Sequence, residues 1–307
     1  MAETARPIDF VQTQVAEQIE RPRKPIPWGR IFTYIILIAG VFFAILPLLW
    51  MISTSLMTVG EISIGRLVPR EPQFVNYADA WERANFSQFM WNSVRITGIS
   101  ITGMLIFSIP AAYAFARMEF FGKNVLFATM LSTLMIPEIV TLIPNFLTVV
   151  WFDRFSKSIC GDFCAWMNNW PSLTVPFMVS AFTIFLLRQF FTQIPEDLFD
   201  AARIDGAGHF RFMLSVVVPL SKAPIMTSVI FAFIGSWNAL LWPLLVVSSD
   251  SWRPVAVGLQ KFVAGDAPGE FHLQMAGAVM MVIPILLLYF FTQRQFTEGI
   301  ASSGLKG

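Results

Sequence analysis

Two cysteines and two histidines are the side chains of this sequence best suited to covalent or metal chemistry. Cys160 and Cys164 stand four residues apart with no histidine near them, and a protein metal site needs more ligands than this pair supplies. A short disulfide in an outward-facing loop and two free thiols both fit the spacing. His209 and His272 fall on opposite sides of the membrane in the topology that the charges favour, so they cannot share a site. We therefore expect neither a metal site nor a catalytic group.

A nucleotide-binding loop is the next chemistry to consider. Such a loop needs the pattern G-x-x-x-x-G-K-[ST], whose backbone N–H groups hold phosphate. The Gly122-Lys123 pair is followed by Asn124, and Arg117 stands where the first glycine belongs. We expect that this chain does not hydrolyse ATP and is not an enzyme.

Polar residues inside apolar segments are candidates for lining a path through the protein, because each is costly in lipid and needs a partner or water. Arg95 and Glu138 have similar predicted depths, which fits a gate or wall of the path, a fixed structural ion pair, or an Arg95 side chain that extends outward to the membrane interface. Asn238, beside Trp237, fits either a cavity wall or an interhelical hydrogen bond. The full set of candidates is Trp237, Asn238, Asn145, Tyr113, Glu138 and Arg95.

Membrane helices must position these residues. The chain is 55% hydrophobic and 13% charged, whereas soluble domains carry about 25% charged residues. A bilayer core about 30 Å thick takes about 20 apolar residues per helix, and the apolar runs lack the alternation of barrel strands. The predicted spans are residues 31–53, 88–116, 125–150, 172–191, 224–247 and 273–292. The net charge of +1 and the spread of Lys and Arg give no sign of nucleic-acid binding.

The Lys and Arg distribution orients these spans. With both termini inside, 13 of the 21 basic residues are cytoplasmic and seven lie in the outside loops, as the positive-inside rule favours. The predicted domains are a cytoplasmic N-terminal tail (1–30), a membrane domain (31–293) and a cytoplasmic C-terminal tail (294–307).

The cytoplasmic segment 196–220, EDLFDAARIDGAGHFRFMLSVVVPL, is charged and patterned between two apolar runs. Pro195 and the acids after it favour a helix start, and Gly206 permits a sharp turn. An apolar face at helical spacing follows, made of Phe210, Met213, Leu214 and Val217. The segment is thus predicted to be two short helices bent at a glycine. Membrane-surface helices prefer basic polar faces, so docking to another protein is favoured over rest on the bilayer.

This segment resembles the EAA loop of the membrane subunits of binding-protein-dependent ATP-binding cassette (ABC) importers. Ala201, Ala202, Asp205, Gly206 and Ala207 match the loop pattern E-A-A-x-x-D-G-A. Asp200 replaces the usual glutamate, and Pro219 precedes Leu220 where the family more often has Leu-Pro. Segments 92–123, 135–146, 185–191, 237–244 and 293–307 are similar to the carbohydrate-uptake, MalG-like branch, so the resemblance covers most of the chain from the first span onward.

The resemblance implies an all-α type I ABC importer permease with six transmembrane helices and both termini cytoplasmic. The EAA segment would be a coupling helix seated on an ATPase subunit, through Asp200, Ala201, Ala202, Arg203, Asp205, Gly206 and Ala207. The implied partners are a second permease, an ABC ATPase dimer that binds ATP and Mg²⁺, and an extracytoplasmic solute-binding protein near residues 248–272. The chain itself would bind no cofactor.

The implied solute is a sugar or oligosaccharide, and the implied location is the plasma membrane of a prokaryote. Glycerol phosphate or another polar solute is an alternative. An ion-coupled secondary transporter is a rival from another class, but only Glu138 hints at it. Residues 152–171 would be an outward-facing insertion, and residues 298–307 would reach the ATPases. Gly206→Asp is predicted to uncouple transport.

Overall fold

The structure is a computed structural model that describes residues 28–262 and 270–304. Every regular element within these ranges is helical, and no strand occurs in them. The chain forms two compact units, Met1–Trp50 and Met51–Gly307. Of the predicted tails, residues 1–27 and 305–307 lie outside the described residues, whereas the backbone of 294–304 continues the last helix.

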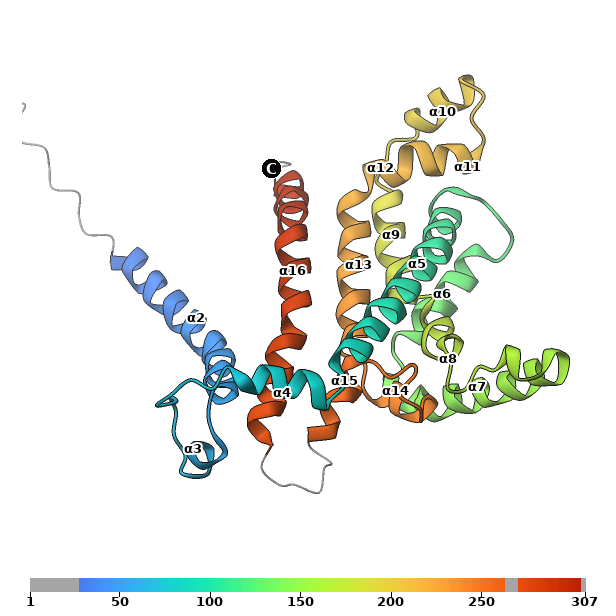
Figure 1. The fold of residues 1–307 in the computed structure, drawn as a ribbon. Helices are drawn as coiled ribbons and strands as arrows, with labels where there is room; N and C mark the ends of the chain where they lie inside the picture. Colours follow the sequence, from blue (N-terminus) through green and yellow to red (C-terminus); the bar gives the residue numbers. More distant parts are fainter. Residues whose placement is uncertain (1–27, 263–269, 305–307) are drawn as a thin grey trace, which may run out of the picture. The chain divides into compact units, whose positions relative to one another are not determined.

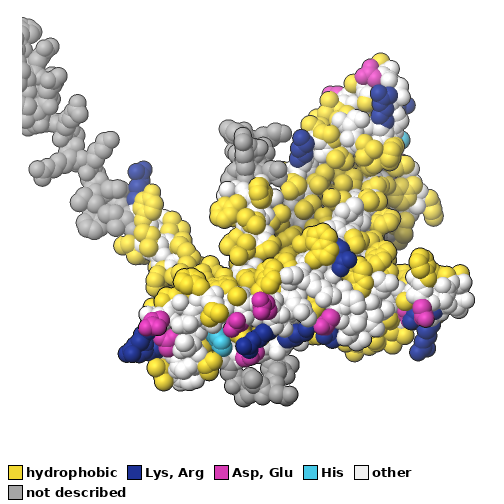
Figure 2. All heavy atoms as spheres, viewed as in Figure 1, with side chains coloured by type: hydrophobic (Ala, Val, Ile, Leu, Met, Phe, Trp, Pro, Cys, Tyr) yellow, Lys and Arg dark blue, Asp and Glu magenta, His cyan; other side chains and the backbone are white. Residues whose placement is uncertain are grey.

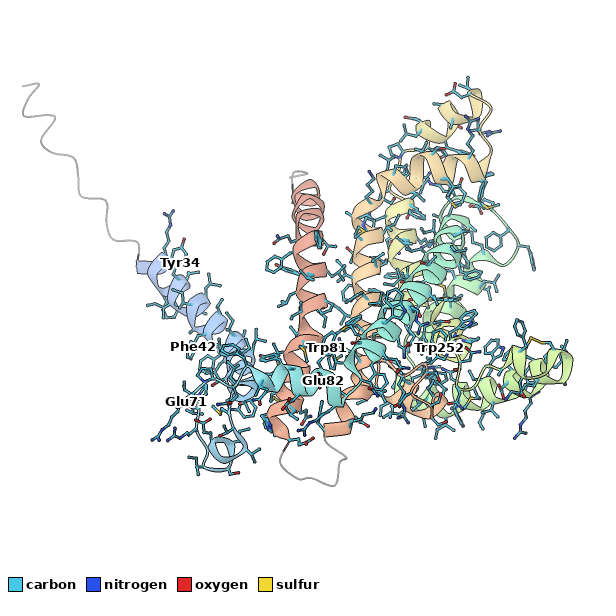
Figure 3. The ribbon with its side chains drawn as sticks, viewed as in Figure 1. Tyr34, Phe42, Glu71, Trp81, Glu82 and Trp252 are labelled. Carbon is cyan, nitrogen blue, oxygen red and sulfur yellow. A yellow bond between two sulfur atoms is a disulfide. The ribbon has the colours of Figure 1, made fainter. Side chains whose placement is uncertain are left out.

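The described part of the first unit is residues 28–50 of helix α2 (Trp28–Ser55). All side chains from 32 to 47 are exposed, including Tyr34 and Phe42, which Figure 3 labels. A helix that is apolar on every side belongs in lipid or against other apolar helices. The sequence-predicted first span, 31–53, therefore corresponds to a real helix of spanning length.

The second unit is built from many helices of unequal length. They are α3 (Val59–Ser63), α4 (Val75–Arg83), α5 (Phe86–Arg117), α6 (Lys123–Thr133), α7 (Glu138–Cys160), α8 (Trp170–Thr174), α9 (Ala181–Phe191), α10 (Asp197–Ile204), α11 (His209–Phe212), α12 (Val218–Leu220), α13 (Lys222–Trp237), α14 (Leu241–Val246), α15 (Val255–Gly258) and α16 (Phe271–Gly304). Figure 1 shows α5, α9 and α13 side by side, with α16 against α13. Trp81 of α4 packs on Phe86 at the start of α5, with 5.4 Å between the ring centroids (Figure 3).

The number of spans agrees with the sequence prediction only if bent pairs are counted. Four helices are long and apolar enough to cross a membrane, and two bent pairs raise the total to as many as six in the described ranges. The prediction of one continuous third helix over 125–150 is wrong, because α6 and α7 meet at an angle of 105°. Pro137 explains the break, since proline disfavours helical geometry in the residue before it.

Two further predicted spans are interrupted. The predicted fourth span, 172–191, comprises α8, a short 3₁₀ turn (Val175–Phe177) and α9, with residues 178–180 outside any helix. The predicted fifth span, 224–247, is α13 followed by α14, with residues 238–240 between them. Non-helical backbone at membrane depth is tolerated only where protein buries it or where it lines a cavity. The breaks therefore point to a cavity in this part of the chain.

Candidate functional site

The segment 196–220 folds as the predicted bent pair of helices, which we call the elbow. Helix α10 ends at Ile204 and is followed by Gly206, whose φ of +78° lies in the left-handed region. Gly206 N donates to Arg203 O at 2.9 Å, and Ala207 N donates to Ala202 O at 2.8 Å. This pair of bonds is a Schellman motif, which satisfies the last carbonyls of a helix and favours glycine. The predicted role of Gly206 in the turn is confirmed.

The first arm of the elbow, α10, presents most of its surface outward. Only Phe199 and Ala202 are half-buried, against a core cluster of the same chain, and Ala201 is exposed. Ile204, at the tip, is 88% exposed. The accessible surface of α10 thus combines apolar Leu198 and Ile204 with acidic Asp197 and Asp200.

The second arm departs from the sequence prediction. Phe212, Met213 and Val217 are buried, whereas Phe210 and Leu214 are exposed. The predicted face of Phe210, Met213, Leu214 and Val217 is thus only half correct. The cause is a π-helical turn over Met213–Val217, which adds a residue to the turn and shifts the apolar register.

Tyr113 of α5 joins the two arms of the elbow. Its hydroxyl is hydrogen-bonded to His209 Nδ1 at 2.9 Å, and the His209 ring stacks on Phe199 with centroids 4.8 Å apart. Tyr113 is 3% exposed, packed in the cluster that contains Phe212. The residue predicted to line a solute path therefore lies at the base of the elbow, where it connects a span to both helices.

Two arginines clamp α5 to α9 beneath the elbow. Arg117 donates from Nε to Phe191 O at 3.0 Å and from its terminal nitrogen to Ile194 O. Arg188 donates in the opposite direction, from Nε to Phe115 O at 3.1 Å. Its guanidinium also lies over the Phe127 ring at 4.1 Å. Each arginine thus satisfies a carbonyl in the last turn of the other helix, where cations are favoured, and Arg117 also reaches the carbonyl of Ile194, three residues beyond the end of α9. We call this pair the arginine clamp.

The far end of α5 holds a different polar structure. Asn92 donates to Arg253 O at 3.0 Å, and Ser93 Oγ accepts from Val255 N at 2.8 Å. Asn92 and Tyr113 are 21 residues apart, which is about 32 Å of α-helix at about 1.5 Å per residue. A bilayer core is about 30 Å thick, so the elbow and the loop 248–262 are separated by a membrane's thickness. Figure 2 shows charged side chains gathered over these two ends and apolar ones between them.

The loop 248–262 is tied together by Asp250. Its two carboxylate oxygens accept from Arg253 at 2.8 Å and from Lys261 at 3.0 Å. Asn168, in the insertion 152–171, accepts from Ser248 N at 2.6 Å. The two outward segments predicted from the sequence therefore form one connected surface.

Acidification is expected to loosen this loop. The hydrogen bond and charge of Lys261, with Arg253, hold the pKa of Asp250 below its usual range. The stabilisation is therefore present when the pH is above the pKa of this carboxyl in the unfolded chain, about 4. It is lost as the pH falls through the lower pKa of the folded state. Hydrogen exchange of peptides covering 250–261 should accelerate across that window. In the Asp250→Asn variant this acceleration at low pH should disappear. If the variant showed the same pH dependence of hydrogen exchange as the native protein, Asp250 would not be the group responsible.

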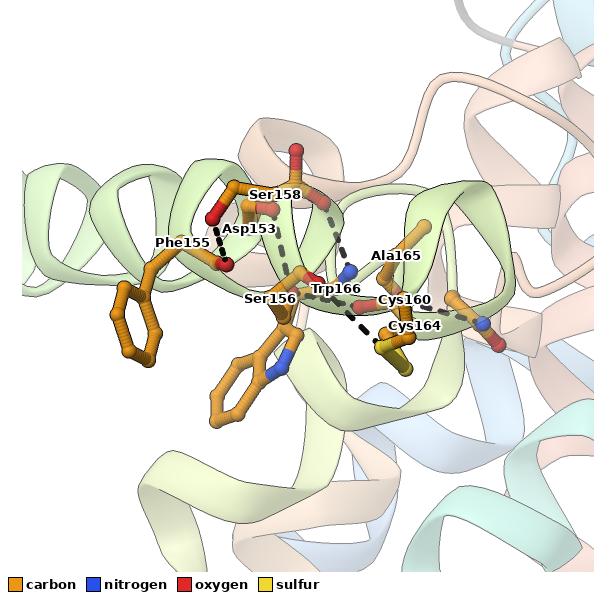
Figure 4. The surroundings of a disulfide bond; sticks show 9 residues. Asp153, Phe155, Ser156, Ser158, Cys160, Cys164, Ala165 and Trp166 are labelled. Carbon is orange, nitrogen blue, oxygen red and sulfur yellow. Dashed lines mark hydrogen bonds between the residues drawn. A yellow bond between two sulfur atoms is a disulfide. The ribbon is translucent and has the colours of Figure 1, made fainter.

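The insertion 152–171 has its own organising carboxylate (Figure 4). Asp153 accepts from Trp166 N at 2.7 Å and Met167 N at 2.9 Å, and it forms an ion pair with Lys157 at 3.1 Å. Cys160 and Cys164 are joined in a disulfide. Of the two states that the spacing left open, the structure contains the bonded one.

A cavity of about 750 Å³ lies among α5, α7, α9, α13 and α14. Its size falls within the range of about 300–1,000 Å³ typical of small-molecule sites. All three helix breaks contribute to its lining or adjoin it: Glu138 follows the first, Ser180 belongs to the second and Asn238 to the third. Ser100, Thr183 and Ser236, which the sequence analysis did not single out, also line it.

The predicted path residues divide between the cavity and other places. Glu138 and Asn238 line the cavity, whereas Asn145 is an exposed residue of α7 outside the lining. Trp237 is 1% exposed, and its Nε1 donates to Met281 O at 3.1 Å, so it belongs to the core. No ion pair between Arg95 and Glu138 occurs among the described residues. Arg95 instead donates to Asn92 Oδ1 and lies 4.5 Å over the ring of Trp252, which Figure 3 labels.

Comparisons with known proteins agree with this architecture. The chain is 31% identical over 287 residues to the sn-glycerol-3-phosphate transport system permease protein UgpE of Brucella abortus, covering 90% of this chain and 98% of the relative. It is 29% identical to the diacetylchitobiose uptake system permease protein NgcG of Streptomyces coelicolor, covering 88% and 86%. A solved bacterial ABC transporter involved in the import of alginate, an acidic polysaccharide, has the same fold, with a TM-score of 0.76 at 24% identity over 88% of this chain and 98% of the other.

The family match spans the elbow and the cavity together. Residues 104–301 match the family described as binding-protein-dependent transport system inner membrane component. The matched range runs from the middle of α5 to the last turn of α16, so it includes the arginine clamp, the elbow and most of the cavity lining. The chain is therefore a multi-pass membrane protein that belongs to the binding-protein-dependent transport system inner membrane components, the permease subunits of ABC importers.

Proposed function

We propose that this chain forms half of the translocation path of an ATP-driven sugar importer and receives the force of ATP binding through the elbow. The observation that carries the proposal is α10, an exposed short helix fixed by Gly206 at one end of the α5–α9–α13 group. Asp200, Ala201, Arg203 and Asp205 are on its accessible surface. Together with Ala202, Gly206 and Ala207 they make up the proposed contact with the ATPase.

The proposed assembly has four kinds of subunit. The elbow would meet an ABC ATPase dimer, which binds ATP and Mg²⁺ and performs the hydrolysis that this chain does not. A second permease would complete the path, and an extracytoplasmic solute-binding protein would dock on the loop 248–262 and the insertion 152–171. One solved alginate transporter of the same fold, at 16% identity and a TM-score of 0.58 over 90% of this chain, is in complex with a solute-bound periplasmic protein. Both termini would be cytoplasmic, in a prokaryotic plasma membrane.

The mechanism is a population shift between inward-facing and outward-facing states. ATP moves that equilibrium only if the ATPase dimer binds it more tightly when closed. Closure would move the elbow, and the elbow would carry α9 along the chain and α5 through Tyr113 and the arginine clamp. Rigid helices packed in this way move as bodies and do not deform continuously.

A sugar is the proposed solute because the cavity combines aromatic walls with neutral hydrogen-bonding groups. Phe177, Phe182 and Phe231 line it beside Ser236 and Asn238. The relative from Streptomyces coelicolor is named for diacetylchitobiose uptake, and the one from Brucella abortus is named for glycerol phosphate transport. Glycerol phosphate is accordingly the second candidate.

Site-specific crosslinking tests the proposed function. A photoreactive amino acid at Ile204, in the native complex, should form an adduct with an ATP-hydrolysing subunit. The matched control is the same probe at Phe163, which is 94% exposed on the outward insertion and should give no such adduct. Adducts from position 204 with lipid or with this chain alone would exclude the proposed coupling role.

A further inference from the structure

The cavity has one charged residue in its lining. Glu138 is the first residue of α7, and no Lys, Arg, His or Asp is among the described residues that line the cavity with it. The neutral polar side chains are Ser100, Ser180, Thr183, Ser236 and Asn238, and the remaining walls are mostly apolar. The electrostatic character of this half of the path is therefore set by one carboxylate.

No ion pair in the described part of the chain neutralises that carboxylate, which stands at the partially positive N-terminal end of α7. Glu138 takes part in none of the ion pairs there. Arg95, the basic residue predicted to pair with it, is held by Asn92 Oδ1 and by the faces of Trp252 and Trp91. The walls beside Glu138 are Ile139 and Leu142. Glu138 itself is an exposed residue. Near a protein surface the effective dielectric constant is about 20, well below that of water, so the field of the carboxylate extends into the cavity.

We propose that Glu138 acts as a charge filter, so that the cavity admits uncharged polyhydroxy solutes and disfavours solutes that carry a phosphate or carboxylate. The inference rests on the proposed function, because it takes this cavity to be part of the solute path. A second negative charge at about 6 Å in surroundings of effective dielectric constant about 20 is disfavoured on the order of a hundredfold. The filter selects between the chemistries for which the relatives are named, an uncharged saccharide and a phosphate ester.

Hydrogen-bonding groups on the facing wall complete the site. Asn238 ends α13 at a helix break, with its Nδ2 donating to Ile234 O at 3.0 Å and its Oδ1 available to accept. Ser236 shares a hydrogen bond of 3.1 Å with Thr97 and retains further donor or acceptor capacity. Amides and hydroxyls match the hydroxyl groups of a polyol, and they lack the positive charge that would strengthen hydrogen bonds to a phosphate.

The test uses a cysteine reporter inside the cavity. Ala239 lines the cavity, and the chain's two native cysteines are joined to each other, so Ala239→Cys supplies one free thiol. In the complete transporter, its reaction rate is measured with two methanethiosulfonates of similar size, one carrying a trimethylammonium and the other a sulfonate. Relative to a free thiol in solution, the cationic reagent should be favoured at least about tenfold. Glu138→Gln should remove most of that preference, and Glu138→Lys should reverse it.

Protection of the cysteine reporter by solutes is the second experiment. Glycerol and a neutral disaccharide should slow labelling of the reporter at concentrations where sn-glycerol 3-phosphate does not. In Glu138→Gln the half-protecting concentration of sn-glycerol 3-phosphate should fall at least about tenfold, with little change for the neutral solutes. The matched control is Glu71→Gln, which removes an exposed carboxylate in the α3–α4 loop. It should change neither the reagent preference nor the solute protection of the reporter.

Three results would overturn the filter. They are equal rates for the two reagents, protection by the phosphate ester as good as by the neutral solutes, and no protection by any of them. The proposed function fails separately: it requires ATP-driven uptake by the complex and contact between position 204 and the ATPase, whatever the charge preference of the cavity.

Discussion

Replacing Gly206 with Asp is expected to reduce ATP-driven uptake at least about tenfold, which corresponds to about 1.4 kcal/mol of lost coupling. The chain itself should still insert and fold. A Cβ at position 206 would meet no atom within 4 Å, and Asp is among the few residues that tolerate a positive φ. Uptake by reconstituted transporter and the ATPase stimulation caused by the solute-loaded binding protein are the measurements. The physical cause would be a new side chain and charge in the contact with the ATPase.

Two other substitutions at the same position separate docking from strain. Gly206→Asn has nearly the same size and the same tolerance of positive φ without the charge, so it should retain more uptake than Gly206→Asp. Gly206→Val places a β-branched residue at a φ of +78°, where such residues are outliers, so it should lower the amount of folded protein. Normal uptake together with normal ATPase stimulation in Gly206→Asp would defeat the coupling role of the elbow.

The sequence predicted the elbow well because its signals are local. The acids at its start, the glycine and the apolar spacing lie within 25 residues, and capping chemistry acts over one or two turns. The register of the second arm was missed for a related reason. A π turn over Met213–Val217 depends on how Phe212 and Val217 pack against α5 and α9, and local spacing does not record that packing.

The breaks in the spans were harder to predict, since proline alone does not decide them. Pro137 lies at the break between α6 and α7, but Pro110 and Pro144 lie inside α5 and α7 without interrupting them. Neighbouring helices can re-satisfy the backbone groups that a proline frees. The outcome is therefore set by tertiary contacts, and apolar run length reports only that a segment belongs in the membrane.

Contacts between distant residues decided which candidates line the cavity. Tyr113 is hydrogen-bonded to His209, 96 positions away, and Trp237 is hydrogen-bonded to Met281, 44 positions away. Arg95 and Glu138 have similar depths in their segments, but depth does not fix the direction of a side chain around the helix axis. The bend before α7 and the position of Trp252 send the two side chains to different partners. Glu138 and Asn238 were found from sequence because each is a polar residue inside an apolar run, and the structure places both beside helix breaks.

Replacing Arg117 with Ala is expected to uncouple the elbow from α5 while ATP hydrolysis continues. The change removes the hydrogen bonds to Phe191 O and Ile194 O, and hydrogen bonds to charged groups are worth about 1.5–3 kcal/mol. Ile194 stands two residues before the elbow, so these bonds fasten α5 to the short connection between α9 and the elbow. Uptake should fall about 10- to 150-fold, with a larger loss than in ATPase activity. Uptake and ATPase rates of the same reconstituted preparation provide the measurement.

The geometry of the clamp supplies the controls. Arg117→Lys keeps the charge, but an ammonium lacks the planar fork that reaches two carbonyls at once, so its uptake should be intermediate. Arg154→Ala, an exposed arginine of α7, should behave as the native protein. Because Arg117 and Arg188 bridge the same two helices, the double alanine variant should lose less than the sum of the single losses, a coupling that a double-mutant cycle measures. Strict additivity, or parallel losses of uptake and ATPase activity, would show that the two arginines hold the helices independently and that α5 does not receive the motion through them.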